Sequence, residues 1–234
     1  MFSIVPSINP EIAKIAPEFR ALSIVVKASS VINPDVGKTA LHGACRAIHE
    51  TDVAWAHQHL SAWSEVFTRF GAKPKRTPCS AEALRKRVLR DGDIPSIDPV
   101  VDLYNAISIK YAIPVGGENI SAYVGHPQLT IANGSELFDV MKNGMLSNES
   151  PDKGEVIWRD NIGVTCRRWN WRQGVRTRLS IESEQMWFIL ESLPSMPLTG
   201  LYEAGESLIE GLKNMMPDAI IEQSLIGIGI NNNN

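Results

Sequence analysis

The side chains best suited to hold an anion form two basic clusters. The first spans residues 73–90, where Glu82 is the only acidic residue, and contains Lys73, Lys75, Arg76, Arg85, Lys86, Arg87 and Arg90. The second is interleaved with three tryptophans and contains Arg159, Arg167, Arg168, Arg172, Arg176 and Arg178. Arginine beside aromatic rings is the combination with which proteins bind phosphate and stack bases. The clusters are therefore candidates for a nucleic-acid contact, and the alternative is a solvated surface with a few cation–π pairs.

Four histidines lie close together, but their spacing does not suit a metal site. His42, His49, His57 and His59 fall on one predicted helical segment. On a helix, His57 and His59 point about 200° apart, and the sequence has no H-E-x-x-H motif. We therefore predict no metal ion, and no motif implies an organic cofactor.

Motifs for a nucleophile or a nucleotide are also missing. The sequence has no G-x-S-x-G, and Cys45 on a helix is more often a small buried hydrophobe than a catalytic thiol. Residues 36–39 (VGKT) resemble the end of a phosphate-binding loop, but Ile32 occupies the position of its first glycine. These departures argue against a serine or cysteine nucleophile and against a nucleoside triphosphatase.

The composition is that of an ordinary globular domain. The 234 residues are 44% hydrophobic and 21% charged, with a net charge of −3. This balance argues against a disordered chain and against indiscriminate coating of nucleic acid. Three cysteines without paired spacing indicate a reducing environment. Neither a signal peptide nor an 18-residue apolar run is recognisable, so we expect a cytoplasmic protein.

The order of the predicted elements indicates an α/β (α+β) fold. Residues 21–28 predict a strand, and residues 35–70 predict one long helix or two helices that meet near residue 51. Ser80 is expected to cap a short helix, and Asp98 with Pro99 to begin another that ends before Pro114. A helix at 199–216 and a strand at 219–230 close the chain. Short strands are expected at 129–132, 155–159, 164–171, 176–179 and 186–191.

Residues 96–119 resemble a known domain family. The run SIDPVVDLYNAISIKYAIPVGGEN begins with Ser96, Ile97, Asp98, Pro99, Val100, Val101 and Asp102, followed by Asn105, Pro114 and Val115. It resembles the B3/B4 domain of the phenylalanyl-tRNA synthetase β subunit, which hydrolyses misacylated tRNA. Residues 184–191 (EQMWFILE) are similar, less strongly, to the family strand that ends in a functional glutamate.

The resemblance implies a single B3/B4-type domain with a mixed sheet flanked by helices. It is clearest over residues 93–192, and we assign the domain to residues 1–230, with a disordered tail at 231–234. Gly116, followed by Gly117, stands where the synthetase domain has a histidine. The pattern PVGG at residues 114–117, followed later by RRWNWR at 167–172, resembles instead the freestanding B3/B4 proteins. Some of that group deacylate tRNA in trans, including tRNA that carries the arginine analogue canavanine.

The same resemblance implies roles for individual residues. Asn105 and Glu191 would position substrate and water, and Gly116 and Gly117 would line the ester. Asp102 and Glu118, together with Glu191, are candidates for an acidic pocket that receives a cationic side chain. Further substrate contacts are expected from Val115, Arg168 and Asn170. Contacts with tRNA are expected from Arg76, Arg85, Lys86, Arg87, Arg90, Arg167 and Arg172.

The function implied by the resemblance is hydrolysis of the ester of a mischarged tRNA, with canavanyl-tRNA(Arg) as the first candidate substrate. Two alternatives stay open. Because Gly116 replaces the family histidine, the chain could be a tRNA-binding module without catalysis. The pocket could also bind a free amino acid, with the arginines serving the fold alone. The sequence does not distinguish a monomer from an oligomer.

Overall fold

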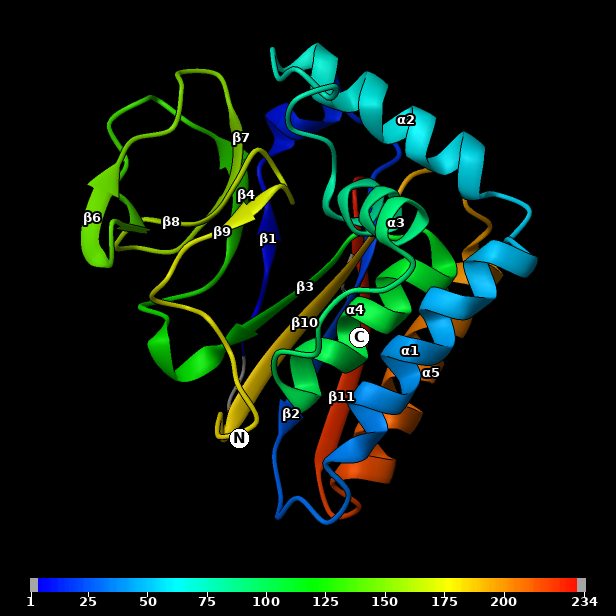
Figure 1. Cartoon of the computed structure of the whole chain (residues 1–234). Helices are drawn as coiled ribbons and strands as arrows, with labels where there is room; N and C mark the ends of the chain where they lie inside the picture. The colour runs from blue at the N-terminus through cyan, green and yellow to red at the C-terminus, as the bar shows by residue number, and fades with distance from the viewer. Residues whose placement is uncertain (1–3, 231–234) are drawn as a thin grey trace.

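The computed structural model describes residues 4–230 and places them in two β-sheets with helices beside them (Figure 1). The expected tail at 231–234 lies outside the described residues. The helices are α1 (Asp35–Glu50), α2 (Ala56–Arg69), α3 (Ser80–Asp91), α4 (Pro99–Tyr111) and α5 (Leu198–Met215), with short 3-10 turns at Pro10–Lys14 and Ile120–Ala122. Within the described part of the chain, no helix is long and apolar enough to cross a membrane.

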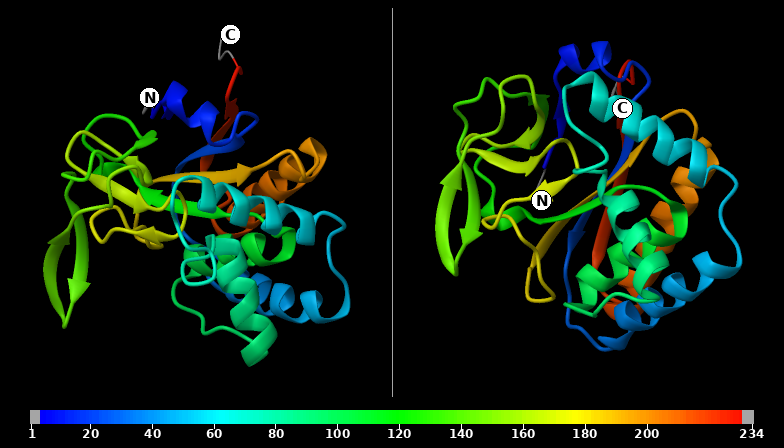
Figure 2. Two further views of the ribbon diagram at one scale, coloured as in Figure 1. Left: turned by 90° about the horizontal axis from the view of Figure 1, so that it is seen from above. Right: turned by 45° about the horizontal axis from the view of Figure 1, so that its top comes forward.

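One sheet has four antiparallel strands in the order β11-β2-β10-β3. Its members are β11 (Ile220–Gly227), β2 (Arg20–Lys27), β10 (Gln185–Ser192) and β3 (Val115–Asn119). The other sheet is mixed, because β1 pairs with β4, and β5 with β8, in parallel. Its order is β1 (Ser7–Ile8), β4 (Gln128–Ile131), β7 (Val156–Arg159), β8 (Val164–Arg167), β5 (Phe138–Lys142) and β6 (Met145–Glu149), with β9 (Arg172–Gln173) also on β8. The β5–β6 hairpin projects away from the helices (Figure 2).

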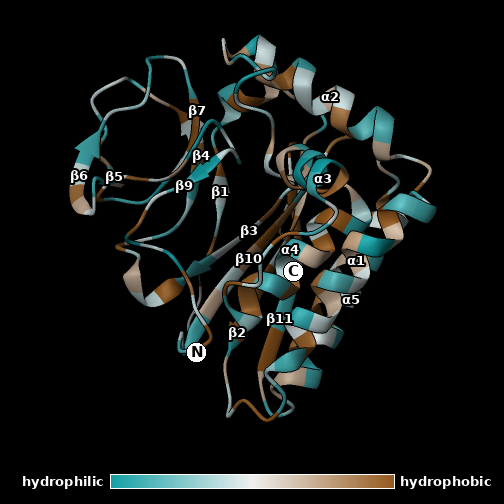
Figure 3. Ribbon diagram, viewed as in Figure 1, coloured by the Kyte–Doolittle hydropathy of each residue, from teal (hydrophilic) through white to brown (hydrophobic). Residues whose placement is uncertain are grey.

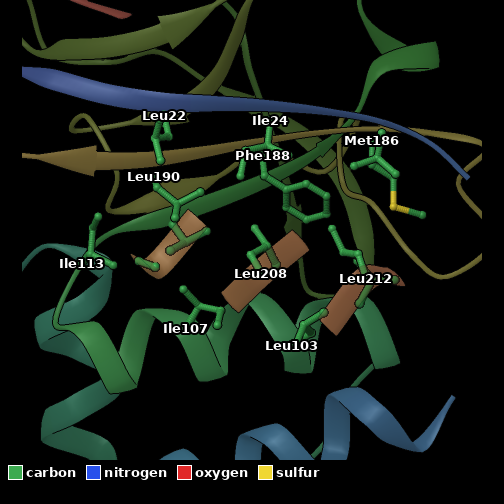
Figure 4. Packing of buried hydrophobic residues seen from close by; sticks show 14 of the residues in the cluster. Leu22, Ile24, Leu103, Ile107, Ile113, Met186, Phe188, Leu190, Leu208 and Leu212 are labelled. Atoms are coloured by element: carbon green, nitrogen blue, oxygen red, sulfur yellow. The ribbon is translucent and has the colours of Figure 1, made fainter. Parts of the chain in front are cut away.

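The main core lies between the four-stranded sheet and two helices. Leu103 of α4 and Leu208 of α5 pack against Ile24 of β2 and Phe188 of β10, all of them buried (Figure 4). Helix α1 packs against α4 and α5 from outside. The hydropathy of the ribbon follows this arrangement: the central strands are hydrophobic, whereas α3 is largely hydrophilic (Figure 3).

Strand β10 separates this core from a second one by the alternation of its side chains. Phe188 and Leu190 point to the helices, whereas Trp187 and Ile189 belong to the cluster on the opposite face. That second core contains edge-to-face aromatic pairs such as Trp158–Trp187, whose ring centroids lie 5.4 Å apart. Glu191 shares the parity of Trp187 and Ile189. The period of the strand therefore turns a carboxyl group into the space between the two sheets.

The fold confirms the predicted α/β class and most of the elements. Residues 35–70 form two helices, and the side chain of Asp98 caps α4 by accepting from the N–H groups of Val100 and Val101. The expected cap at Ser80 is wrong, because Ser80 is the first helical residue and Cys79 precedes it without a side-chain cap. Residues 176–179 do not form the expected strand, and β1, β3, β5, β6 and β9 were not predicted as such.

Candidate functional site

A cavity of about 280 Å³ lies at the edge of the four-stranded sheet, where β3 meets α4 and the turn after β8. It contains two buried glutamates, one from β3 and one from β10. The lining residues are Ser80, Ala83, Leu84, Tyr104, Asn105, Val115, Gly116, Gly117, Glu118, Trp158, Cys166, Trp169, Asn170, Trp171, Gln173, Trp187, Ile189 and Glu191. The structure thus brings together most of the substrate-site residues expected from the sequence.

Glu191 is held by three hydrogen-bond donors. The indole N–H groups of Trp158 and Trp169 donate to its Oε1 at 2.8 and 3.0 Å, and the amide of Asn170 donates to its Oε2 at 2.8 Å. Burial raises the pKa of Glu191 to about 7, although the three donors favour the carboxylate. Near neutral pH this side chain can therefore both accept and release a proton, as a general base must.

Glu118 is the second carboxyl group of the cavity. It lies opposite Trp187 in the β3–β10 ladder, so both residues point toward the second sheet. The hydroxyl of Tyr123 donates to its Oε2. Burial raises the pKa of Glu118 to about 8, against the opposing effect of the neighbouring polar side chains of Gln173, Thr165 and Thr177. Glu118 is therefore mainly a neutral acid at pH 7.

The buried neutral form of Glu118 makes stability depend on pH. Below about pH 4.5 this carboxyl is protonated in both the folded and the unfolded chain, so it carries no penalty. Between there and about pH 8 only the unfolded chain releases the proton, so the free energy of unfolding falls as pH rises. We expect Glu118→Gln to abolish this pH-dependent decrease in the free energy of unfolding, which is on the order of a few kcal/mol. Thermal melts of both proteins from pH 4 to 9 measure it. If the melting temperatures of the two proteins change in parallel over this pH range, Glu118 is not the group responsible.

The edge of β3 presents backbone donors to the cavity. The N–H of Glu191 donates to the carbonyl of Pro114 at 2.9 Å, so the even-numbered residues of β3 pair with β10. The odd-numbered residues face outward: the carbonyl of Gly117 accepts from Gln173 at 2.8 Å, and the N–H of Asn119 donates to Thr177 at 2.9 Å. The N–H of Gly117 therefore points away from β10, toward the cavity that this residue lines.

Gly117 is required by close packing and not by an unusual backbone angle. A β-carbon there would lie 2.8 Å from both Leu179 Cδ2 and Tyr104 Cε1, and at Gly116 it would lie 3.1 Å from Ile189 Cγ2. Neither glycine has a positive φ. The absent side chain of Gly117 instead lets α4 approach β3.

Asn105 lies on α4 with its side chain half-buried and lines the cavity. No other described residue hydrogen-bonds its amide, which leaves both its donor and its acceptor for a ligand. Val115 and Asn170 also line the cavity. The buried Asn170 Oδ1 has no partner within the described residues.

Asp102 does not contribute to the cavity. It is buried at the start of α4, where it accepts from the hydroxyl of Ser96 and from the N–H of Ile97 at 2.9 Å. These bonds fasten the segment before the helix, so the expected acidic wall consists of Glu118 and Glu191 without Asp102.

Sequence reasoning missed several residues of the cavity, including Tyr104, Trp158, Cys166, Gln173 and Trp187. Cys166 is no candidate nucleophile, because burial and the charges of both glutamates raise its thiol pKa well above the ordinary value. The alternation of EQMWFILE was the available signal for Trp187, since it shares a face with Glu191. No comparable signal connects Trp158 to β10.

The expected tRNA-binding residues are dispersed, and two of them are occupied inside the fold. Arg85 is buried and binds Asp52 and the carbonyl of Ile109. Arg167 is buried and forms a two-bond pair with Glu155. The roles proposed for these two are therefore wrong. Lys86, Arg87 and Arg90 are exposed on α3 and pair with neighbouring carboxylates, and Arg172 is exposed 3.7 Å from Glu149.

Arg76 and Arg168 line a different cavity, so the expected substrate contact of Arg168 is not in the cavity of the glutamates. As to metals, residues 4–230 hold no group of three His, Cys, Asp or Glu side chains arranged to bind an ion.

The architecture and the site together define an α/β domain with a two-carboxyl cavity at a sheet edge. A family model described as the B3/4 domain matches residues 62–198, more than half of the chain, and the chain belongs to this family. This confirms the resemblance of residues 96–119. Among solved structures, an N-terminal fragment of the phenylalanyl-tRNA synthetase β subunit from Pyrococcus horikoshii is similar at 8% identity and a TM-score of 0.47. The match covers 94% of this chain and 51% of that one. No curated protein sequence matches the chain.

Proposed function

We propose that this chain is a trans-acting deacylase that hydrolyses the ester between an amino acid and tRNA. Membership in the B3/4 family supports a tRNA-related role, either editing or binding. The observation that favours editing is the pair of buried carboxyl groups beside an outward backbone N–H. An ester that is already activated needs chiefly an oriented water and stabilisation of the oxyanion.

Each group has a defined step in the proposed reaction. Glu191, as the carboxylate, takes a proton from water while the water oxygen attacks the ester carbonyl. The N–H of Gly117 and the amide of Asn105 donate to the oxyanion that forms. As the tetrahedral intermediate collapses, the bond between the carbonyl carbon and the ribose oxygen breaks, and Glu118, as the neutral acid, gives its proton to that oxygen. The products are the free amino acid and tRNA, and proton exchange with solvent returns Glu191 to the carboxylate and Glu118 to the acid. The pKa values of about 7 and about 8 suit these opposite roles near neutral pH.

Canavanine is the proposed amino acid. Its guanidino group is much less basic than that of arginine, so it can enter a desolvated cavity uncharged and then bind to a carboxyl group. Arginine would have to bury a permanent charge beside Glu118, which burial keeps mainly protonated near neutral pH. The cavity would therefore reject the correct amino acid through the cost of its charge.

A panel of aminoacyl-tRNAs tests the proposal. We expect the wild type to hydrolyse canavanyl-tRNA(Arg) at least tenfold faster than arginyl-tRNA(Arg), since one unit of pKa difference is a factor of ten. Loss of activity in Asn105→Ala would connect the reaction to the cavity. Hydrolysis of a different member only would remove canavanine, and tight tRNA binding without any hydrolysis would select the binding-module alternative. Salt-insensitive binding of a free amino acid, without affinity for tRNA, would show instead that the chain is an amino-acid-binding protein.

A further inference from the structure

A second cavity, of about 520 Å³, opens beside the site and is rich in basic side chains. Two segments far apart in the sequence form it, the chain that leaves α2 and the chain on either side of β7 and β8 (Figure 1). Lys73 and Arg76 come from the first segment, and Lys153 and Arg168 from the second. We call this cavity, defined by these four side chains, the basic cleft.

Three of the four charges of the basic cleft are available to a ligand. Lys73, Arg76 and Lys153 are exposed, and none of them forms an ion pair with another described residue. Two carboxylates also line the cleft. Glu155 is buried and already bound by Arg167, at 2.7 Å from its Nη2, and by the backbone N–H of Arg168 at 2.9 Å. Asp152 is exposed and lies 3.4 Å from Arg168.

One strained turn forms the wall between the basic cleft and the cavity of the glutamates. Arg168 and Trp169 both adopt left-handed backbone angles, with φ of 45° and 65°, which consecutive non-glycine residues rarely do. Arg168 lines the basic cleft, whereas Trp169 lines the other cavity and donates to Glu191. Consecutive residues of the chain therefore reach the two sites from the same turn.

We propose that the basic cleft binds phosphodiester groups of the tRNA strand whose aminoacyl end occupies the cavity of Glu191. This inference rests on the proposed function. A polynucleotide strand that ends in the smaller cavity must continue beyond it, and the basic cleft is lined by the residue that directly precedes Trp169 of that cavity. Four basic side chains against one exposed carboxylate suit the repeated negative charge of such a strand.

Binding of uncharged tRNA, measured by fluorescence anisotropy across a salt series, tests the proposal without requiring hydrolysis. The variant Lys73→Ala/Arg76→Ala/Lys153→Ala should raise Kd about tenfold or more and reduce the slope of log Kd against log salt by about 0.7 for each lost contact. The matched control Lys38→Ala/Arg46→Ala/Lys142→Ala removes the same charge from exposed positions elsewhere. It should change Kd by less than about threefold. Equal weakening in both variants, or no binding by the wild type, overturns the proposal.

A substitution of opposite sign provides a second readout. Asp152→Asn removes the exposed carboxylate that pairs with Arg168, so tRNA should bind about threefold or more tighter. Inorganic phosphate distinguishes the source of the bound group. Compared with chloride at equal ionic strength, it should compete only weakly, and strong competition at low millimolar phosphate would overturn the assignment to a polynucleotide.

Hydrolysis of an aminoacyl-adenosine separates this proposal from the proposed function. That small ester reaches the glutamates without a phosphodiester in the basic cleft, so the wild type and the triple variant should cleave it at equal rates. If the wild type cleaves neither this ester nor aminoacyl-tRNA, the proposed deacylase function fails. The comparison of tRNA binding by the triple variant and its control would still show whether the basic cleft binds tRNA.

Discussion

Glu191→Gln should lower kcat for aminoacyl-tRNA hydrolysis by about 100-fold or more, with a much smaller change in KM. The amide cannot accept a proton from water, and a positioned general base contributes roughly 10²–10⁴ to a rate. The shape of the cavity and the tRNA contacts remain, so substrate binding should persist. Single-turnover rates at saturating protein, together with tRNA binding, measure the two effects separately.

The glutamine variant should fold because the local hydrogen bonds can adjust. Its carbonyl oxygen can accept from Trp158 and Trp169 as Oε1 does now. Its amide group would face the amide of Asn170, but Asn170 can rotate and offer Oδ1, which has no partner among the described residues. Glu191→Ala would instead leave three buried donors unsatisfied. Glutamine is therefore the variant that separates chemistry from stability.

Glu206→Gln is the matched control, because it makes the same chemical change on an exposed position of α5. Its rate should equal that of the wild type. A Glu191→Gln protein with an unchanged melting temperature and a nearly normal rate would show that Glu191 is not the base. It would then be only the acceptor that holds Trp158, Trp169 and Asn170 in place.

Gly37→Ala should destabilise the fold by about 3 kcal/mol, at the upper end of the usual cost of overpacking. Gly37 lies on α1 against the start of α4, and a β-carbon there would overlap the carbonyl oxygen of Pro99. This neighbour is backbone and cannot rotate away, so α1 must move from α4. Chemical denaturation measures this change in the free energy of unfolding. The expected loss is a large share of the total of about 5–15 kcal/mol that is typical of a domain.

Gly43→Ala, on the same helix, is the control for Gly37→Ala. A β-carbon at Gly43 would meet nothing within 4 Å. Alanine favours a helix over glycine by about 1 kcal/mol, so this variant should be neutral or slightly more stable. Equal effects of the two substitutions would mean that α1 does not press against Pro99, and the support of α4, which carries Asn105, would need another explanation.

The sequence predicted the parts of the site that a local pattern describes. The motif at 96–119 identified Asn105, Gly116 and Gly117, and the strand pattern of residues 184–191 identified Glu191. Glu118 was expected as one of the carboxylates that would receive a cationic side chain. The three donors of Glu191 could not be predicted as such, because Trp158 and Trp169 reach it only after the two sheets pack together.

The errors have a common physical cause. Arg85, Arg167 and Asp102 were judged by their charge, but each is neutralised or hydrogen-bonded by a partner that the fold supplies. Asp52 lies 33 positions from Arg85, and Glu155 lies 12 from Arg167. A basic cluster in a sequence therefore does not distinguish an exposed anion site from a buried ion pair. The converse also holds: Lys73 and Lys153 are 80 positions apart in the sequence, yet the fold places them in the same cleft.

The pH dependence of kcat/KM for aminoacyl-tRNA hydrolysis, corrected for spontaneous hydrolysis, tests the central claim most directly. The pair of carboxyl groups with pKa values of about 7 and about 8 predicts a rate that rises up to about pH 7 and declines above about pH 8. The rising limb should disappear in Glu191→Gln and remain in Glu206→Gln. Hydrolysis no faster than the background at every pH, or the same rising limb in Glu191→Gln, would contradict a deacylase that works through Glu191.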